Sequence, residues 1–200
     1  MTPDDLDALT RRPGPGPHRT TIDIDGIATE TLADLPPRRD GLLFVGLNPS
    51  PVSVDAGHYH QGRLGRRFWS RLMHTGIIPS RTDLAAADDA LVDAGHGITD
   101  LIKRPSPRDE ASDEELRHGI GPLWQKIALW RPGAVVFIYK RAAQIAAGRT
   151  VEEPWGQLDG VALGGRPCFL MPGPYASTEQ VDEGLNLLRN LAASLPVDRP

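Results

Sequence analysis

The chain has 200 residues, of which 40% are hydrophobic and 24% are charged, and its net charge is −4. These values are ordinary for one soluble globular domain with a sizeable core, and the negative charge argues against a protein that coats nucleic acid. Cys168 is the only cysteine, which excludes internal disulfides, iron–sulfur clusters and cysteine-rich zinc sites.

The first 40 residues are predicted to form an N-terminal extension. Residues 1–19 are polar and rich in proline, which indicates a flexible lead and not a signal peptide. Residues 21–31 alternate in polarity around Asp25-Gly26, a favoured two-residue turn, and so predict a β-hairpin. The segment LPPRRD, residues 35–40, indicates a linker. No apolar run reaches the ~20 residues that cross a bilayer, so we expect no membrane contact and a cytoplasmic location, on the nucleoid in a bacterium.

Residues 41–200 are predicted to form the main domain, in which short apolar strands alternate with amphipathic helices. Strands are predicted within residues 41–47, 95–102, 133–139, 161–165 and 166–172, and helices over residues 66–76, 112–130, 140–148 and 177–195. Continuous apolar strands that alternate with helices indicate an α/β fold, with a mainly parallel sheet covered on both faces.

Two of these helices begin with a capping box, formed by Ser112 with Glu115 and by Ser177 with Gln180. Within the first of them, Pro122 is expected to kink or split the helix. Its apolar residues recur at helical spacing and are expected on one buried face: Leu116, Ile120, Leu123, Trp124 and Ile127.

Polar or loop-forming residues follow four of the predicted strands. Asn48, Asp100 and Lys140 stand at or near three strand ends, and Met171-Pro172-Gly173 stands at a fourth. Sites in parallel sheets lie beyond the carboxyl ends of the strands. We therefore expect these four segments to meet at one edge of the sheet.

The amide of Asn48, which is followed by Pro49, has two interpretations. Asparagine is a common cap that hydrogen-bonds its own turn. Alternatively, the amide orients a water molecule or a polar edge of a substrate. An amide is not a strong base, so it suits a reaction whose leaving group departs largely on its own. Hydrolysis of an N-glycosidic bond fits, because its transition state resembles an oxocarbenium ion.

Several catalytic signatures are missing from the sequence: the glycine-rich phosphate loop, the nucleophile elbow and the zinc-deaminase pattern. His58 and His60 with Asp55 offer metal-ligand atoms, but no convincing further ligand accompanies them, so we expect no metal site and no cofactor. Between His58 and His74 there is no acidic residue, and this stretch is either a solvated helix start or a surface for nucleic acid. Its arginines are Arg63, Arg66, Arg67 and Arg71.

Four segments together resemble the mismatch-specific uracil/thymine-DNA glycosylases of the uracil-DNA glycosylase superfamily. They are GLNPSP, GHYHQGRLGRRFW, GITDLIKRPSPRDEASDEEL and WGQLDGVALGGRPCFLMPGPYAS, and the resemblance runs from about residue 42 to residue 195. It implies a three-layer αβα sandwich around a short, mainly parallel sheet, with residues 41–200 as the catalytic domain. It also implies a monofunctional enzyme of base excision repair that needs no cofactor. Such an enzyme flips uracil, or thymine or another damaged base, out of mismatched double-stranded DNA and hydrolyses its bond to deoxyribose. We expect it to act as a monomer.

The resemblance also assigns roles to single residues. Asn48 matches the asparagine that positions the attacking water, while Gly46, Leu47 and Ser53 are expected near the base. His60 takes the place of the ring that stacks on the flipped base, with Tyr59 as its neighbour. The MPGPYAS loop is expected to enter the minor groove and to fill the gap left by the base. Contacts with DNA are accordingly predicted for Arg63, Arg66, Arg67, Lys140, Pro172, Gly173, Tyr175 and Ser177.

The sequence departs from the family pattern at several positions, and these leave the preferred base open. Ser50 replaces the glycine after Asn-Pro, His60 replaces a phenylalanine or tyrosine, and Pro174-Tyr175 stand where relatives carry small or aliphatic residues. The resemblance gives Asp100 no assigned role. It is either a second catalytic group or a capping carboxylate, which would pair with the cation that follows it at position 103 or 104.

Two other functions use the same features. One is a non-catalytic module that binds DNA lesions on the same fold, against which the asparagine at residue 48 argues. The other is a hydrolase of free nucleosides, which would need a cluster of aspartates to bind the sugar hydroxyls. The run AAADDAL, residues 85–91, is interpreted instead as a helix surface.

Overall fold

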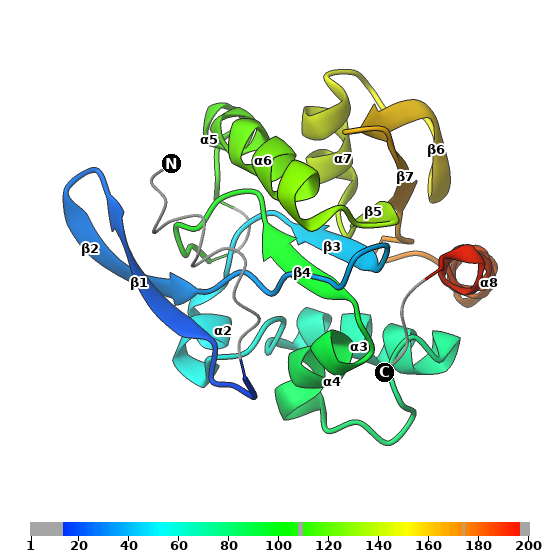
Figure 1. Ribbon diagram of the computed structural model, residues 1–200, viewed down its shortest axis with the longest axis horizontal. Helices are drawn as coiled ribbons and strands as arrows, with labels where there is room; N and C mark the ends of the chain where they lie inside the picture. The colour runs from blue at the N-terminus through cyan, green and yellow to red at the C-terminus, as the bar shows by residue number, and fades with distance from the viewer. Residues whose placement is uncertain (1–13, 108–109, 174, 197–200) are drawn as a thin grey trace.

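The computed structural model describes residues 14–107, 110–173 and 175–196, and its centre is a five-stranded sheet of order β4-β3-β5-β7-β6 (Figure 1). Four strands are parallel and β6 is an antiparallel strand at one edge. The strands are β3 (Leu42–Gly46), β4 (Gly97–Asp100), β5 (Ala134–Phe137), β6 (Gly156–Leu163) and β7 (Arg166–Leu170). This arrangement confirms the predicted mixed α/β class, although β6 begins before the strand expected at residues 161–165.

Helices cover both faces of this sheet, which makes three layers (Figure 1). One layer holds α5 (Asp113–His118), α6 (Ile120–Trp130) and α7 (Lys140–Ala147), and the other holds α3 (Arg63–Thr75), α4 (Ala87–Asp93) and α8 (Thr178–Ser194). The short helix α2 (Pro51–Ala56) lies between β3 and α3 in the chain, and η1 (Leu84–Ala86) lies between α3 and α4. None of the described helices is long and apolar enough to cross a membrane.

Strand β3 shows why the sheet is buried on both sides. All five of its residues are buried, and successive side chains of a strand point to opposite faces. Leu42 and Phe44 join the core cluster under α3 and α8, whereas Leu43 and Val45 join the cluster under α6 and α7. An unbroken apolar run is therefore required here, in place of the alternation seen in half-exposed strands.

A separate two-stranded hairpin precedes this domain and projects from its side (Figure 1). It consists of β1 (Arg19–Ile24) and β2 (Ile27–Leu32), and its turn residues Asp25 and Gly26 have φ values of 54° and 81°. Positive φ at both central residues is the requirement of the favoured hairpin turn, so the predicted hairpin is confirmed. The interpretation of residues 35–40 as a linker is wrong at its start. Leu35 is fully buried and forms a bridge with Ile98 of β4.

The helix predicted over residues 112–130 is split, as expected, but the break falls at Gly119. A Cβ on Gly119 would overlap the carbonyl of Leu101, so the chain turns where only glycine fits. Pro122 lies in the first turn of α6, where a missing N–H disturbs no helical hydrogen bond. Trp124 is 42% exposed, and its predicted place on the buried face is wrong, because it lies about 100° around the helix from buried Leu123.

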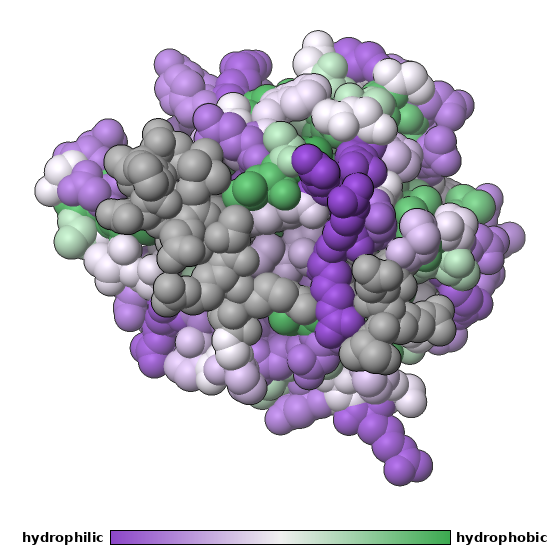
Figure 2. Space-filling view, in the orientation of Figure 1, coloured by the Kyte–Doolittle hydropathy of each residue, from purple (hydrophilic) through white to green (hydrophobic). Residues whose placement is uncertain are grey.

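Both predicted capping boxes are present, at Ser112 with Glu115 and at Ser177 with Gln180. They begin α5 and α8, two helices in different layers. The surface on the side seen in Figure 1 is mostly hydrophilic, and its apolar atoms form small separate patches (Figure 2). This is the ordinary surface of a globular domain.

Candidate active site

A cleft of about 680 Å³ opens beside the carboxyl ends of the parallel strands. It collects residues from the loops after β3, β4, β5 and β7, which are far apart in the sequence. The lining residues are Leu32, Asn48, Pro49, Ser50, Ser53, Tyr59, His60, Gly62, Arg63, Leu64, Gly65, Asp100, Ser106, Tyr139 and Tyr175. Asn48 and Asp100, two of the residues expected at one edge of the sheet, line this cleft together, whereas Lys140 and residues 171–173 are not among its lining residues.

The side chain of Asn48 is held in one orientation. Its Nδ2 donates to the carbonyl oxygens of Pro49 and Ser106, at 3.1 and 3.2 Å, and to the hydroxyl of Ser106 at 2.9 Å. Because carbonyl oxygens only accept hydrogen bonds, the NH₂ group must face them. The Oδ1 of Asn48 is buried and has no hydrogen-bond partner. These hydrogen bonds therefore fix the direction in which Oδ1 of Asn48 can accept a hydrogen bond.

Segment 101–106 supports the loop that carries Asn48 through backbone hydrogen bonds. Backbone N–H groups of Leu101, Ile102 and Ser106 donate to the carbonyls of residues 46, 47 and 49, at 3.1 Å in each case. On the other side of Pro49, the hydroxyl of Ser50 caps α2 by accepting from the N–H of Ser53. The chain around Asn48 is thus tied on both sides, which limits the motion of its amide.

Asp100 lines the same cleft as Asn48 and is only 3% exposed. It pairs with Gly46 in the register of β3 and β4. A Cβ on Gly46 would overlap Oδ1 of Asp100, so the glycine leaves room for the carboxylate above the backbone. The described ion pairs of Lys103 and Arg104 are made with other carboxylates, Asp34 for Lys103 and Glu115 for Arg104.

A buried charge network lies next to these residues. Asp34 accepts from Lys103 and Lys126, at 2.5 and 2.8 Å, and from the hydroxyl of Thr99. Burial alone would raise the pKa of Asp34, but the two lysines outweigh burial and hold this pKa well below its usual range. Asp34 is thus an anion at neutral pH. Sequence reasoning missed this network, whose members carry no common spacing.

Tyr59 is 2% exposed and is bound by several groups. Its hydroxyl donates to the carbonyl of Ala33 at 2.9 Å and accepts from Lys103 at 3.0 Å. Burial raises the pKa of Tyr59 well above its ordinary value, and the nearby carboxylates, first among them Asp100, raise it further. The phenol is therefore neutral at physiological pH.

His60 also lines the cleft, and its backbone has a strained conformation. Its φ is +55°, a value that non-glycine residues rarely adopt. The imidazole packs against Phe68 and Trp69, with ring centroids at 4.7 and 6.0 Å. Burial lowers the pKa of His60 to about 4, so the ring is neutral at pH 7, and its Nε2 is buried without a hydrogen-bond partner. A neutral flat ring suits stacking on a base, and the choice between His60 and Tyr59 as the stacking ring stays a prediction.

The buried side chain of Ser53 stabilises the loop that carries Tyr59 and His60. It is 3% exposed, and its hydroxyl accepts from Ser50 Oγ at 2.9 Å and from the N–H of Gln61 at 3.1 Å. These bonds connect the start of α2 to the loop that carries Tyr59 and His60. Both side chains and Ser53 itself line the cleft.

The loop after β7 is tied to α3 by a residue that sequence reasoning did not single out. Arg71 donates to the carbonyls of Pro172 and Gly173, at 2.7 and 3.2 Å. Pro172 is buried, whereas Tyr175 is 87% exposed at the rim of the cleft. Pro174 lies outside the described residues. The only sequence signal for Arg71 was its place in the basic stretch between His58 and His74.

Of the other predicted DNA contacts, Arg63 lines the cleft, whereas Arg66, Arg67, Lys140 and Ser177 are not among its lining residues. Arg63, Arg66 and Arg67 are exposed on the first turns of α3, and Lys140 is exposed at the first position of α7. Ser177 caps α8, and its hydroxyl accepts from the N–H of Gln180.

His58 and His60, considered together as metal ligands in the sequence, lie in different surroundings. Nδ1 of His58 is 2.8 Å from Oδ1 of Asp88, whereas the ring of His60 packs on aromatic side chains of α3. Asp55 is exposed on α2. The three side chains therefore do not converge on one point.

A comparison with protein-family models agrees with this geometry. Residues 33–182 match the family described as the uracil DNA glycosylase superfamily. The match covers the whole central sheet and every described residue that lines the cleft except Leu32.

Proposed function

The chain belongs to the uracil DNA glycosylase superfamily, whose members are DNA glycosylases, and we propose that it hydrolyses the bond between uracil and deoxyribose in mismatched duplex DNA. The orientation of Asn48 carries this proposal. Its Nδ2 is occupied by protein acceptors and its Oδ1 has no protein partner. A water molecule that donates a hydrogen bond to this oxygen is held with its own lone pair directed away from Asn48.

The proposed reaction begins with departure of the base. The bond from C1′ to the base nitrogen breaks, its electron pair leaves with the base, and the sugar becomes an oxocarbenium ion. The water on Asn48 then adds its oxygen to C1′ and loses a proton. Asp100 lies in the same cleft, and its carboxylate both favours the cation electrostatically and takes this proton. Such positioning raises the rate without a strong base.

Access to the bond requires the nucleotide to leave the duplex. The neutral ring of His60, which lines the cleft, is proposed to stack on the extruded base, with the ring of Tyr59 as the alternative. Tyr175, exposed at the rim, is the side chain proposed to fill the vacated position, as wedge residues of minor-groove proteins do. Arg63, Arg66 and Arg67 would contact phosphates, since an acidic protein must concentrate its positive charge to approach DNA.

We propose a preference for uracil opposite guanine, with thymine opposite guanine as a weaker substrate. A wobble pair costs less to open than a Watson–Crick pair. Ser50 lines the cleft and its hydroxyl caps α2. Compared with a glycine at this position, the side chain leaves less space beside Asn48. The smaller space favours smaller bases.

The deciding experiment uses end-labelled duplexes that contain one target base, followed by hot alkali, which cleaves the chain at abasic sites. Wild-type protein should release uracil from the U·G duplex faster than from the U·A duplex. Asn48→Ala should lose at least roughly 10²-fold in single-turnover rate while binding the duplex with nearly unchanged affinity. Wild-type-like cleavage by this variant removes Asn48 from the mechanism. Duplex binding without any cleavage by wild type identifies a lesion-binding module, and release of bases only from free nucleosides identifies a nucleoside hydrolase.

A further inference from the structure

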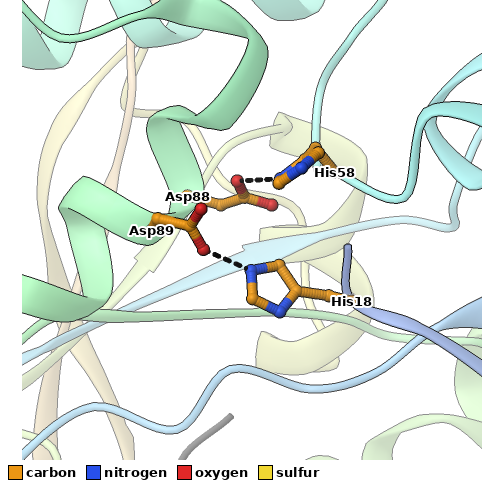
Figure 3. Close-up of side chains that lie close together, drawn as sticks. All are labelled: His18, His58, Asp88 and Asp89. Carbon is orange, nitrogen blue, oxygen red and sulfur yellow. Dashed lines mark hydrogen bonds and ion pairs between the residues drawn. The ribbon is translucent and has the colours of Figure 1, made fainter. Parts of the chain in front are cut away.

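We propose that His18, His58, Asp88 and Asp89 bind one divalent transition-metal ion, of which zinc is the best fit. The four side chains point toward one another from three separate segments (Figure 3). His18 precedes β1, His58 follows α2, and the two aspartates lie in the first turn of α4. One ligand atom from each residue lies within 4.8 Å of all the others. None of the four lines the cleft, so this site is separate from the proposed chemistry.

The charges of the cluster call for a dication. Asp88 is 0% exposed and His18 is 4% exposed, and two neighbouring carboxylates carry two negative charges. Among the described residues, the basic side chains within ion-pair distance of these carboxylates are His18 and His58. One divalent ion held by two imidazole nitrogens and two carboxylate oxygens would balance these two negative charges through coordinate bonds.

The donor set and its dimensions favour zinc. Two imidazole nitrogens and two carboxylate oxygens form a four-coordinate set of the kind that Zn²⁺ accepts, whereas magnesium and calcium prefer oxygen alone. Zinc ligands at ~2.0–2.1 Å stand roughly 3.3 Å apart at the corners of a tetrahedron. In the structure Nε2 of His18 is 2.7 Å from Asp89 Oδ1, and Nδ1 of His58 is 2.8 Å from Asp88 Oδ1. Small shifts of these side chains would admit the ion.

Backbone groups around the cluster hold the carboxylates in place. The N–H of Tyr59 donates to Oδ2 of Asp88 at 2.8 Å, and the N–H of Gly16 donates to Oδ1 of Asp89 at 2.9 Å. A Cβ on Gly16 would overlap the imidazole of His58, so the backbone there lies directly on the ring. Such outer partners orient the ligands of metal sites.

The ion would fasten the N-terminal segment and α4 to the loop that carries Tyr59 and His60. His18 also bonds this region through its backbone, because its N–H donates to the carbonyl of Gly57 at 2.7 Å. The proposed role is therefore structural. The metal limits the motion of the loop that carries Tyr59 and His60, and it takes no part in bond breaking.

The test begins with protein produced without a polyhistidine tag in medium that contains zinc. Elemental analysis should find about one zinc per chain. After removal of metal with EDTA, the melting temperature should fall, and it should rise again with added Zn²⁺ in proportion to the logarithm of its concentration. Co²⁺ added to the stripped protein should give the visible absorption of a tetrahedral complex. Wild-type protein that holds no metal, and whose melting temperature ignores Zn²⁺, Co²⁺ and Mn²⁺, overturns the proposal and leaves two His–Asp pairs.

Variants then locate the site. His58→Gln should weaken zinc binding by more than the roughly 10- to 100-fold that outer partners contribute, and Asp88→Asn, which keeps an acceptor for the N–H of Tyr59, should do the same. His118→Gln is the matched control, because His118 is exposed at the end of α5, and it should bind zinc like wild type. If a cluster variant fails to fold, the zinc titration of stripped wild type still decides the matter. Equal zinc binding by wild type and both folded cluster variants places the metal elsewhere and overturns the assignment.

Discussion

Ser106 accepts two hydrogen bonds from the amide of Asn48, through its carbonyl and its hydroxyl, although 58 residues separate the two positions. The carbonyl excludes one flip state of the amide, since an Oδ1 placed there would face another acceptor. The hydroxyl adds a further hydrogen bond, at 2.9 Å. Ser106 is therefore a positioning residue for Asn48.

Ser106→Ala should lower the single-turnover rate of uracil release about fivefold, the effect of losing a hydrogen bond of about 1 kcal/mol. The affinity for duplex DNA should stay the same, because Ser106 acts on Asn48. Ser106→Thr keeps the hydroxyl and should restore most of the rate. Ser80→Ala, at an exposed position, is the matched control. A change in duplex affinity without a change in rate would contradict this role.

Asp100→Asn should slow uracil release and remove the acid limb of its pH–rate profile, because an amide cannot accept a proton or balance the oxocarbenium charge as a carboxylate does. Asn48→Ala and Asp100→Asn should each leave measurable activity, and the double variant should be inactive. Rates across pH under single-turnover conditions check this. If Asp100→Asn alters only the melting temperature, Asp100 is a structural residue.

Tyr175→Ala should reduce base flipping while the melting temperature of the protein stays unchanged, because the side chain is 87% exposed. A duplex with 2-aminopurine beside the target base reports flipping as a rise in fluorescence. Tyr175→Phe, which keeps the ring, should flip like wild type. An undiminished fluorescence rise with Tyr175→Ala would rule out the wedge role.

Asp34→Asn should destabilise the fold by roughly 3–5 kcal/mol, because it leaves Lys103 and Lys126 without their buried counter-charge. The exposed substitution Asp159→Asn is the control. Denaturant unfolding at pH 7 measures the loss of unfolding free energy in each variant. A loss in Asp34→Asn no larger than that in Asp159→Asn would contradict the stabilising role of the network.

The same network predicts how stability depends on pH. The pKa of Asp34 is lower in the folded protein than its ordinary value of about 3.9. A lowered carboxyl pKa stabilises the fold above the unfolded value, and this stabilisation is lost as pH falls below about 4. Wild type should therefore lose stability on the acid side more steeply than Asp34→Asn. Parallel curves of melting temperature against pH for the two proteins would contradict this assignment.

The sequence by itself determined the class of the fold and the place of Asn48. Unbroken apolar strands, helices with capping boxes and the Asp25-Gly26 turn are local patterns, and each reflects contacts within a few residues or burial on both faces of a sheet. The segment resemblance was sufficient to indicate the superfamily that the family match shows. The break at Gly119 escaped prediction, since it depends on the carbonyl of a distant residue, Leu101.

Only the tertiary structure decided which groups stabilise the cleft and which form the His–Asp cluster. Ser106 meets Asn48, Arg71 meets the loop at Pro172, and His18 meets Asp89, 71 residues away. None of these pairs has a spacing that a helix or a strand would reveal. Hydrogen bonds and ion pairs are set by distances of a few ångströms in space, and those distances arise when the sheet and its two helical layers bring separate loops to the same edge.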